Sequence, residues 1–129
     1  LPEEMAIAQE LFGAIGDTMV IEENLMKAAT VLGASGIAFF MRYLRAATQG
    51  GIQMGFHPEE AQRIAVQTAK GAAVLLQEDI SHPELEIDKV TTPQGCTIEG
   101  LNEMEHQGFS SALIKGLMTS FQKLDSIRS

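Results

Sequence analysis

Small and apolar side chains recur at helical spacing over residues 58–77, and this pattern constrains the fold more than any other feature of the sequence. Residues on one face of a helix recur every three or four positions, so the stripe is the packed side of a helix. Because most of its members are small, the stripe favours close approach by another helix. It consists of Ala61, Ile64, Ala65, Thr68, Ala72, Leu75 and Leu76.

Comparable spacing predicts further helices along most of the chain. Gly33–Gly36 should interrupt the helical pattern, and Gly55 should cap the helix that precedes it. Gly50 and Gly51 weaken that helix, which the close approach of another backbone would explain. Ser110 is a candidate cap for the last helix. The expected helices cover residues 2–12, 22–32, 37–54 and 58–77, a short segment around Ile98 to Met104 that ends at Gly108, and a final segment through Leu124.

Residues 18–21, Thr-Met-Val-Ile, predict one short strand, because they are partly β-branched and follow Gly16 and Asp17. A lone strand cannot form a sheet. We therefore expect residues 1–21 to be the tail of a larger sheet-containing domain, the alternative being that these residues form no strand. Residues 22–129 would then be a separate, all-α domain.

The charge balance narrows the classes of partner. The chain has 17 Asp and Glu against 9 Lys and Arg, which argues against nucleic acid because phosphate binding needs a basic face. An uninterrupted apolar run of about 18 residues is absent, so we expect no membrane span. The single cysteine, Cys96, excludes an internal disulfide and fits a reducing compartment. We expect a cytoplasmic location.

Residues 82–105 contain the most informative motif. Thr91 and Thr92 precede Pro93-Gln94-Gly95-Cys96-Thr97, which leads directly into a helix. A glycine-containing turn at a helix start directs several backbone N–H groups toward one point, where a carboxylate or phosphate can bind. The alternative is an ordinary turn in which a threonine hydroxyl caps the helix.

Other chemical sites are less well supported. His57, His82 and His106 lie far apart beside turns and lack metal-binding spacing, so we expect no metal. The acids Glu99, Glu103 and Glu105 fit a solvated helix face better than a catalytic pair. Cys96 is adjacent in sequence to no histidine that could act as its base. A GxGxxG fingerprint is absent, so this chain carries no recognisable dinucleotide site.

The segment from Val90 to Leu101, followed by Glu105 and Gly108-Phe109, resembles the signature of pyrroline-5-carboxylate reductases. Ala34-Ser35-Gly36-Ile37-Ala38-Phe39 and Gly51 to Phe56 are similar to two further segments of that family, and the resemblance runs from about Leu11 to Leu124. This sequence has Gln94 where the family has the first of two glycines, and Ile37 where it has proline. If position 94 needs a positive φ, glutamine is strained there.

The resemblance implies an architecture. The family has an N-terminal Rossmann domain that binds NAD(P)H and a C-terminal helical domain that forms an intertwined dimer. Residues 22–129 correspond to the helical dimerisation and substrate-binding domain, and residues 1–21 to the last helix and strand of the missing Rossmann domain. The helices at 37–54 and 58–77 would be the interlocking elements. We expect a homodimer, with a larger oligomer also open.

The resemblance also implies a reaction, the NAD(P)H-dependent reduction of 1-pyrroline-5-carboxylate to L-proline. Backbone N–H groups of Gly95, Cys96 and Thr97, together with the Thr92 hydroxyl, would hold the substrate carboxylate. Thr97 would be the catalytic residue, hydrogen-bonded to the ring nitrogen. The cofactor would bind outside this chain, which alone should be inactive. The alternative is a non-catalytic helical dimerisation module derived from that scaffold.

Overall fold

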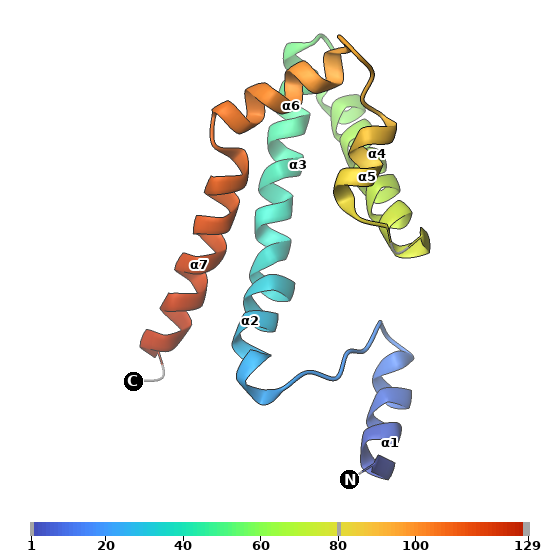
Figure 1. Ribbon diagram of the computed structural model, residues 1–129, viewed down its shortest axis with the longest axis vertical. Coiled ribbons are helices and arrows are strands. Elements are labelled where there is room, and N and C mark those ends of the chain that lie inside the picture. Colours follow the sequence, from blue (N-terminus) through green and yellow to red (C-terminus); the bar gives the residue numbers. More distant parts are fainter. Residues whose placement is uncertain (1, 80, 128–129) are drawn as a thin grey trace.

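Every regular element is helical in the part of the chain that the computed structural model describes, residues 2–79 and 81–127 (Figure 1). This confirms the predicted all-α class. The elements are α1 (Pro2–Gly13), η1 (Glu23–Leu25), α2 (Met26–Thr30), η2 (Val31–Ser35), α3 (Gly36–Gln53), α4 (Pro58–Asp79), α5 (Pro83–Lys89), α6 (Cys96–His106) and α7 (Phe109–Ile127).

One uninterrupted helix runs from Glu23 to Gln53, so the predicted break at Gly33–Gly36 is wrong. The chain passes these glycines in a π-helical turn, η2, in which the Gly36 N–H donates to the Val31 carbonyl. The helical backbone hydrogen bonds therefore continue through this segment. Val31 is buried, and η2 packs on α7. This burial offsets the roughly 1 kcal/mol that a glycine costs inside a helix.

The α3–α4 hairpin holds most of what the chain buries on its own. Gly55, with φ +112°, ends α3 as predicted: its N–H donates to Ile52 O at 3.0 Å, and the next N–H, of Phe56, donates to Gly51 O at 3.1 Å. The chain then turns back and α4 packs on α3. Gly51 and Ala61 are buried where the two helices meet. This confirms the predicted close approach at Gly51, whereas Gly50 meets no neighbour.

The predicted strand at residues 18–21 does not form. Residues 17–22 connect α1 to η1 without regular structure, and α1 lies apart from the other helices (Figure 1). A strand is stabilised by hydrogen bonds to a neighbouring strand, and the described residues offer none. The predicted first helix is confirmed as α1.

Helix α5 was missed by the sequence analysis. His82 and Pro83 start this helix: Pro83 occupies its first turn, and Nδ1 of His82 accepts a hydrogen bond from the Glu84 N–H at 3.2 Å. Proline suits a helix start because its missing N–H would have no intrahelical partner there.

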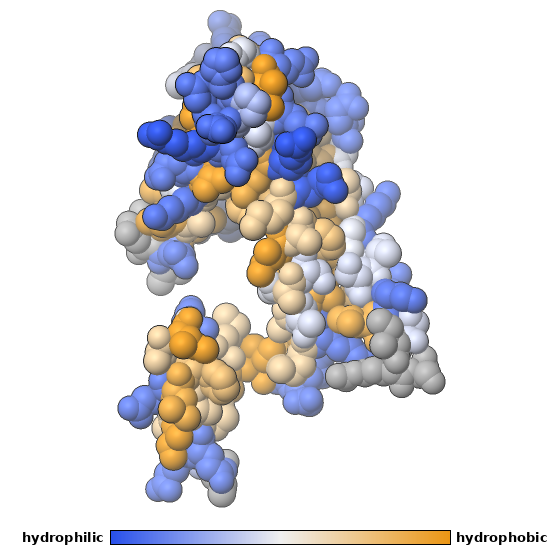
Figure 2. Space-filling view, turned by 180° about the vertical axis from the view of Figure 1, so that it is seen from behind, coloured by the Kyte–Doolittle hydropathy of each residue, from blue (hydrophilic) through white to orange (hydrophobic). Residues whose placement is uncertain are grey.

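The chain exposes far more surface than a compact monomer. Its accessible area is 10931 Å², whereas a compact 13.9 kDa monomer would expose about 6,700 Å². Apolar side chains form a stripe along α1 and reappear over the middle of the molecule (Figure 2). By length and composition alone, the helix from Glu23 to Gln53 could also cross a membrane. The excess surface indicates that much of this apolar face is covered in the assembled protein.

Gly51→Ala should destabilise the chain by about 1–3 kcal/mol, because the new Cβ overpacks the α3–α4 contact. A Cβ built on Gly51 would lie 2.8 Å from Ala61 Cβ, whereas one on Gly50 meets nothing within 4 Å. The matched control Gly50→Ala should therefore be neutral or stabilise by up to about 1 kcal/mol. Urea unfolding of both variants measures the difference, and equal free energies of unfolding would contradict the packing.

Candidate functional site

Thr92, Pro93, Gln94 and Gly95 form a tight turn between α5 and α6. The Gly95 N–H donates to the Thr92 carbonyl oxygen at 3.0 Å, which closes the turn. Pro93, at the second position of the turn, fixes φ at about −65°. Gln94, at the third position, has a positive φ, as a type II turn requires. Residues 92–95 are therefore a rigid entry to α6.

Gln94 adopts φ +58°, the only positive φ of a non-glycine residue among those that the structure describes. The position therefore requires the left-handed conformation that the sequence analysis considered, and glutamine adopts it at a steric cost. The turn keeps the backbone shape that a glycine would give it. Gly95 is needed for a different reason: a Cβ there would clash with the Thr92 hydroxyl and lie 3.0 Å from its carbonyl oxygen.

Gly95 is the N-cap of α6, and no side chain caps this helix. The threonine-capped alternative is therefore not what the structure adopts. The first N–H groups of a helix have no intrahelical acceptor, which leaves those of Cys96 and Thr97 available to a ligand. The Gly95 N–H is already used inside the turn. Thr92, Cys96 and Thr97 are exposed, so their polar groups are open to solvent.

Helix α5 supports the turn from the other side. The Thr91 hydroxyl donates to the Ile87 carbonyl oxygen at 2.6 Å, and the Thr91 N–H donates to Asp88 O at 3.3 Å. Lys89 Nζ lies 2.7 Å from Glu86 Oε1. This lysine, together with the Ser81 hydroxyl, lowers the pKa of Glu86. The Thr91 hydroxyl is thus bonded to the backbone of α5, whereas Thr92 is exposed.

The other candidate groups stay apart. His57 and His82 begin α4 and α5, and His106 ends α6. Within residues 2–79 and 81–127, no three His, Cys, Asp or Glu side chains gather as they would around a metal ion. Glu99, Glu103 and Glu105 are exposed, which confirms the solvated face. The chemistry of the site therefore depends on backbone N–H and hydroxyl groups.

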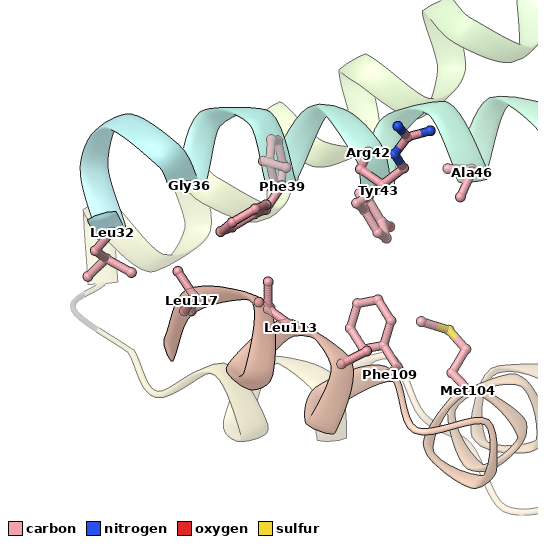
Figure 3. A pocket seen from close by; sticks show the side chains of 14 residues that line it. Leu32, Gly36, Phe39, Arg42, Tyr43, Ala46, Met104, Phe109, Leu113 and Leu117 are labelled. Carbon is pink, nitrogen blue, oxygen red and sulfur yellow. The ribbon is translucent and has the colours of Figure 1, made fainter. Parts of the chain in front are cut away.

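An apolar groove of about 1010 Å³ lies between α3 and α7 and was not predicted. Phe39 and Tyr43 point from α3 toward Phe109, Leu113 and Leu117 of α7 (Figure 3). Met104 of α6 closes one end. The groove depends on the angle between two helices, which periodicity does not report. The apolar spacing that predicted the helices now seen as α3 and α7 nevertheless indicated the residues on either side of the groove.

Gln94→Gly should stabilise the chain by about 1 kcal/mol, because glycine adopts a positive φ without the steric cost that glutamine pays. Gly95→Ala should instead destabilise it, since its Cβ would clash with Thr92. Denaturant unfolding measures both changes. A lower free energy of unfolding for Gln94→Gly would contradict the strained turn.

The chain matches the family model for pyrroline-5-carboxylate reductase dimerisation over residues 23–127. It is 59% identical over 123 residues to pyrroline-5-carboxylate reductase 1 of Dictyostelium discoideum. The aligned residues make up 95% of this chain and 22% of that relative. It is 50% identical over 119 residues to pyrroline-5-carboxylate reductase 2 of the same organism, covering 92% of this chain and 40% of that relative.

Solved structures agree. The 1-pyrroline-5-carboxylate reductase of Streptococcus pyogenes superposes with a TM-score of 0.89 at 27% identity, over 96% of this chain and 48% of that one. The Plasmodium falciparum pyrroline carboxylate reductase, solved with NADP bound, shares the fold with a TM-score of 0.89 at 20% identity, over 98% of this chain and 48% of that one. The chain thus spans less than half the length of these relatives. It belongs to the pyrroline-5-carboxylate reductase family, as a dimerisation domain.

Proposed function

We propose that this chain supplies the substrate turn and the dimer interface of an enzyme that reduces 1-pyrroline-5-carboxylate to L-proline. The observation that carries the proposal is the uncapped start of α6 behind Gly95, in a chain of this family. The substrate is a small cyclic imine with a carboxylate. A helix start with free N–H groups suits that carboxylate by hydrogen bonding and by the helix dipole.

In this proposal, each residue of the turn has its own role in binding the substrate. The N–H groups of Cys96 and Thr97 and the Thr92 hydroxyl bind the substrate carboxylate. Gly95 contributes by having no side chain, because a Cβ there would displace Thr92. The Thr97 hydroxyl hydrogen-bonds the ring nitrogen, orients the C=N bond and helps to deliver the nitrogen's proton. No strongly acidic or basic side chain is required.

NAD(P)H supplies the hydride for this reaction. The residues of this chain do not fit that cofactor, because they include no GxGxxG turn. We propose that an N-terminal Rossmann domain outside this sequence binds it, with residues 1–21 as the tail of that domain. The exposed apolar face of α1, which includes Ile7, Leu11 and Phe12, is consistent with such a neighbour. This chain alone would then be inactive.

The partner in our proposal is a second copy of this chain. The surface in excess of a compact monomer is about 4,000 Å² for one chain, more than the roughly 1,000–2,500 Å² that each partner of an obligate dimer commonly buries, so it leaves room for a neighbouring domain as well. The α3–α7 groove and the helix from Glu23 to Gln53 provide the apolar part of it. A partner copy accounts for that helix without a membrane, and the net charge of −8 disfavours nucleic acid. We place the protein in the cytoplasm, which the single exposed thiol of Cys96 supports.

The alternative function is a non-catalytic dimerisation module. Its main support is Gln94, because a glutamine in place of the family's glycine could give the turn another shape. Since Gln94 takes a positive φ, the turn is preserved. The observation therefore favours the reductase.

Thr97→Ala in the full-length protein should lower kcat/KM by about tenfold to a hundredfold, because it removes one hydrogen bond to the reacting imine. Thr97→Ser keeps the hydroxyl and is the matched control. Steady-state kinetics with 1-pyrroline-5-carboxylate and NAD(P)H measure both. Unchanged kinetics in Thr97→Ala would reject its role, and an inactive wild-type enzyme would favour the module.

Leu113→Asp should convert the dimer of this chain to a monomer, because it places a charge in the apolar groove. Ile15→Asp is the control, since Ile15 is 85% exposed and lies outside the matched residues 23–127. Light scattering in detergent-free buffer reports the mass. A wild-type monomer would contradict the dimer, and a chain that is soluble only in detergent would point to a membrane.

A further inference from the structure

The proposed substrate turn depends on a corner at the opposite end of α6. Helix α6 begins at Cys96, directly behind the turn, and ends at His106, two residues before the corner into α7. Its direction therefore decides where Thr97 lies. Whatever fixes the angle between α6 and α7 also places the turn.

Two restraints at this corner are backbone and packing features. Gly108 adopts φ +81°, and its N–H donates to the Glu105 carbonyl oxygen at 2.9 Å. The Phe109 ring meets Tyr43 of α3 edge-on, with ring centroids 6.4 Å apart. These contacts end α6 and join α7 to α3.

A third restraint crosses the corner through side chains. The Ser110 hydroxyl, on the first turn of α7, donates to Glu105 Oε1 at 2.7 Å. Ser110 was predicted to cap its own helix, but it bonds to the preceding one instead, because α7 already begins at Phe109. The Ser110–Glu105 hydrogen bond therefore joins α6 to α7. By contrast, the bond from Gln107 Nε2 to Glu103 Oε1, at 2.8 Å, lies at the end of α6 and does not reach α7.

A small change at the corner becomes a large displacement at the turn. From Thr97 to Glu105 the helix axis measures about 12 Å, at roughly 1.5 Å for each residue. A rotation of roughly 10° at the corner would move Thr97 by about 2 Å. A shift of that size would take the N–H donors of the turn out of hydrogen-bond range of the substrate carboxylate, which weakens substrate binding.

We infer that Glu105 is a positioning residue for the substrate turn: by accepting the Ser110 hydroxyl across the α6–α7 corner, it fixes the direction of α6. The inference rests on the proposed function, because the turn must bind substrate for its placement to affect kinetics. Glu105 touches neither substrate nor cofactor. Its carboxylate acts only as an acceptor, so a glutamine side chain can replace it.

The test uses the full-length dimeric protein. Glu105→Ala should raise KM for 1-pyrroline-5-carboxylate about tenfold and change kcat less, because the turn binds the carboxylate. Ser110→Ala should have the same effect, and the double variant should be no worse than either single one. Glu105→Gln should restore KM to within about twofold of the wild type. The matched control is Glu103→Ala, which removes a similar hydrogen bond that does not cross the corner.

Amide hydrogen exchange at Gly100 and Leu101, whose N–H groups are bonded within the first turns of α6, gives a second measurement that needs no catalysis. It should be faster in Glu105→Ala and Ser110→Ala than in Glu103→Ala, while the thermal midpoint and dimer mass are the same in all three. Equal KM and equal exchange in Glu105→Ala and Glu103→Ala would overturn the inference, as would failure of Glu105→Gln to restore them. If the wild type does not reduce the imine, the proposed function fails, and exchange alone decides the inference.

Discussion

The close contact between Gly51 and Ala61 is the interaction on which the rest of this chain depends. It lets α3 and α4 pack against each other at small separation, and it holds the buried residues of the hairpin. Elsewhere the chain buries little: beyond Val31, which packs near α7, and Thr48, whose hydroxyl is bonded to Leu44 O at 2.8 Å, the described residues are at least partly exposed. Around this hairpin the chain therefore carries a large apolar surface that it does not cover by itself.

The exposed apolar surface and the match to a dimerisation family both indicate that a second copy of the chain covers part of this surface. A stripe of small residues permits close helix packing within the chain, whereas the large side chains on α3 and α7 leave a groove that the chain cannot fill itself. Helices 37–54 and 58–77, expected to interlock with a second copy, first pack on each other. Their outer faces and the groove are then free for that copy. Such an arrangement links stability to assembly, because burial in the dimer adds to the stability of each chain.

The sequence predicted those features that local chemistry determines. Helical spacing located α1, α3, α4 and α7, and the glycines at 55 and 108 were recognised as turns because a positive φ is easy only for glycine. The turn before α6 was predicted from the same local rules. The π turn at Val31–Ser35 was missed because glycines usually break helices, and here packing outweighs that tendency. Helix α5 was missed because it is short, although His82 and Pro83 form a favourable helix start. The groove and the Glu105–Ser110 bond join separate helices, which periodicity cannot reveal.

Helix α6 links the two parts of the proposed function. Its first residues present the N–H groups that suit a carboxylate, and Met104, near its other end, lines the groove between α3 and α7. A second copy seated in that groove would press on the same helix that positions Thr97. In the proposed function, substrate binding and dimerisation share this helix, so that a change in either would alter the other. Such a coupling would explain why a turn without any ionised catalytic side chain lies on a dimerisation domain, because its donors would be effective only when the helix behind them is held in place.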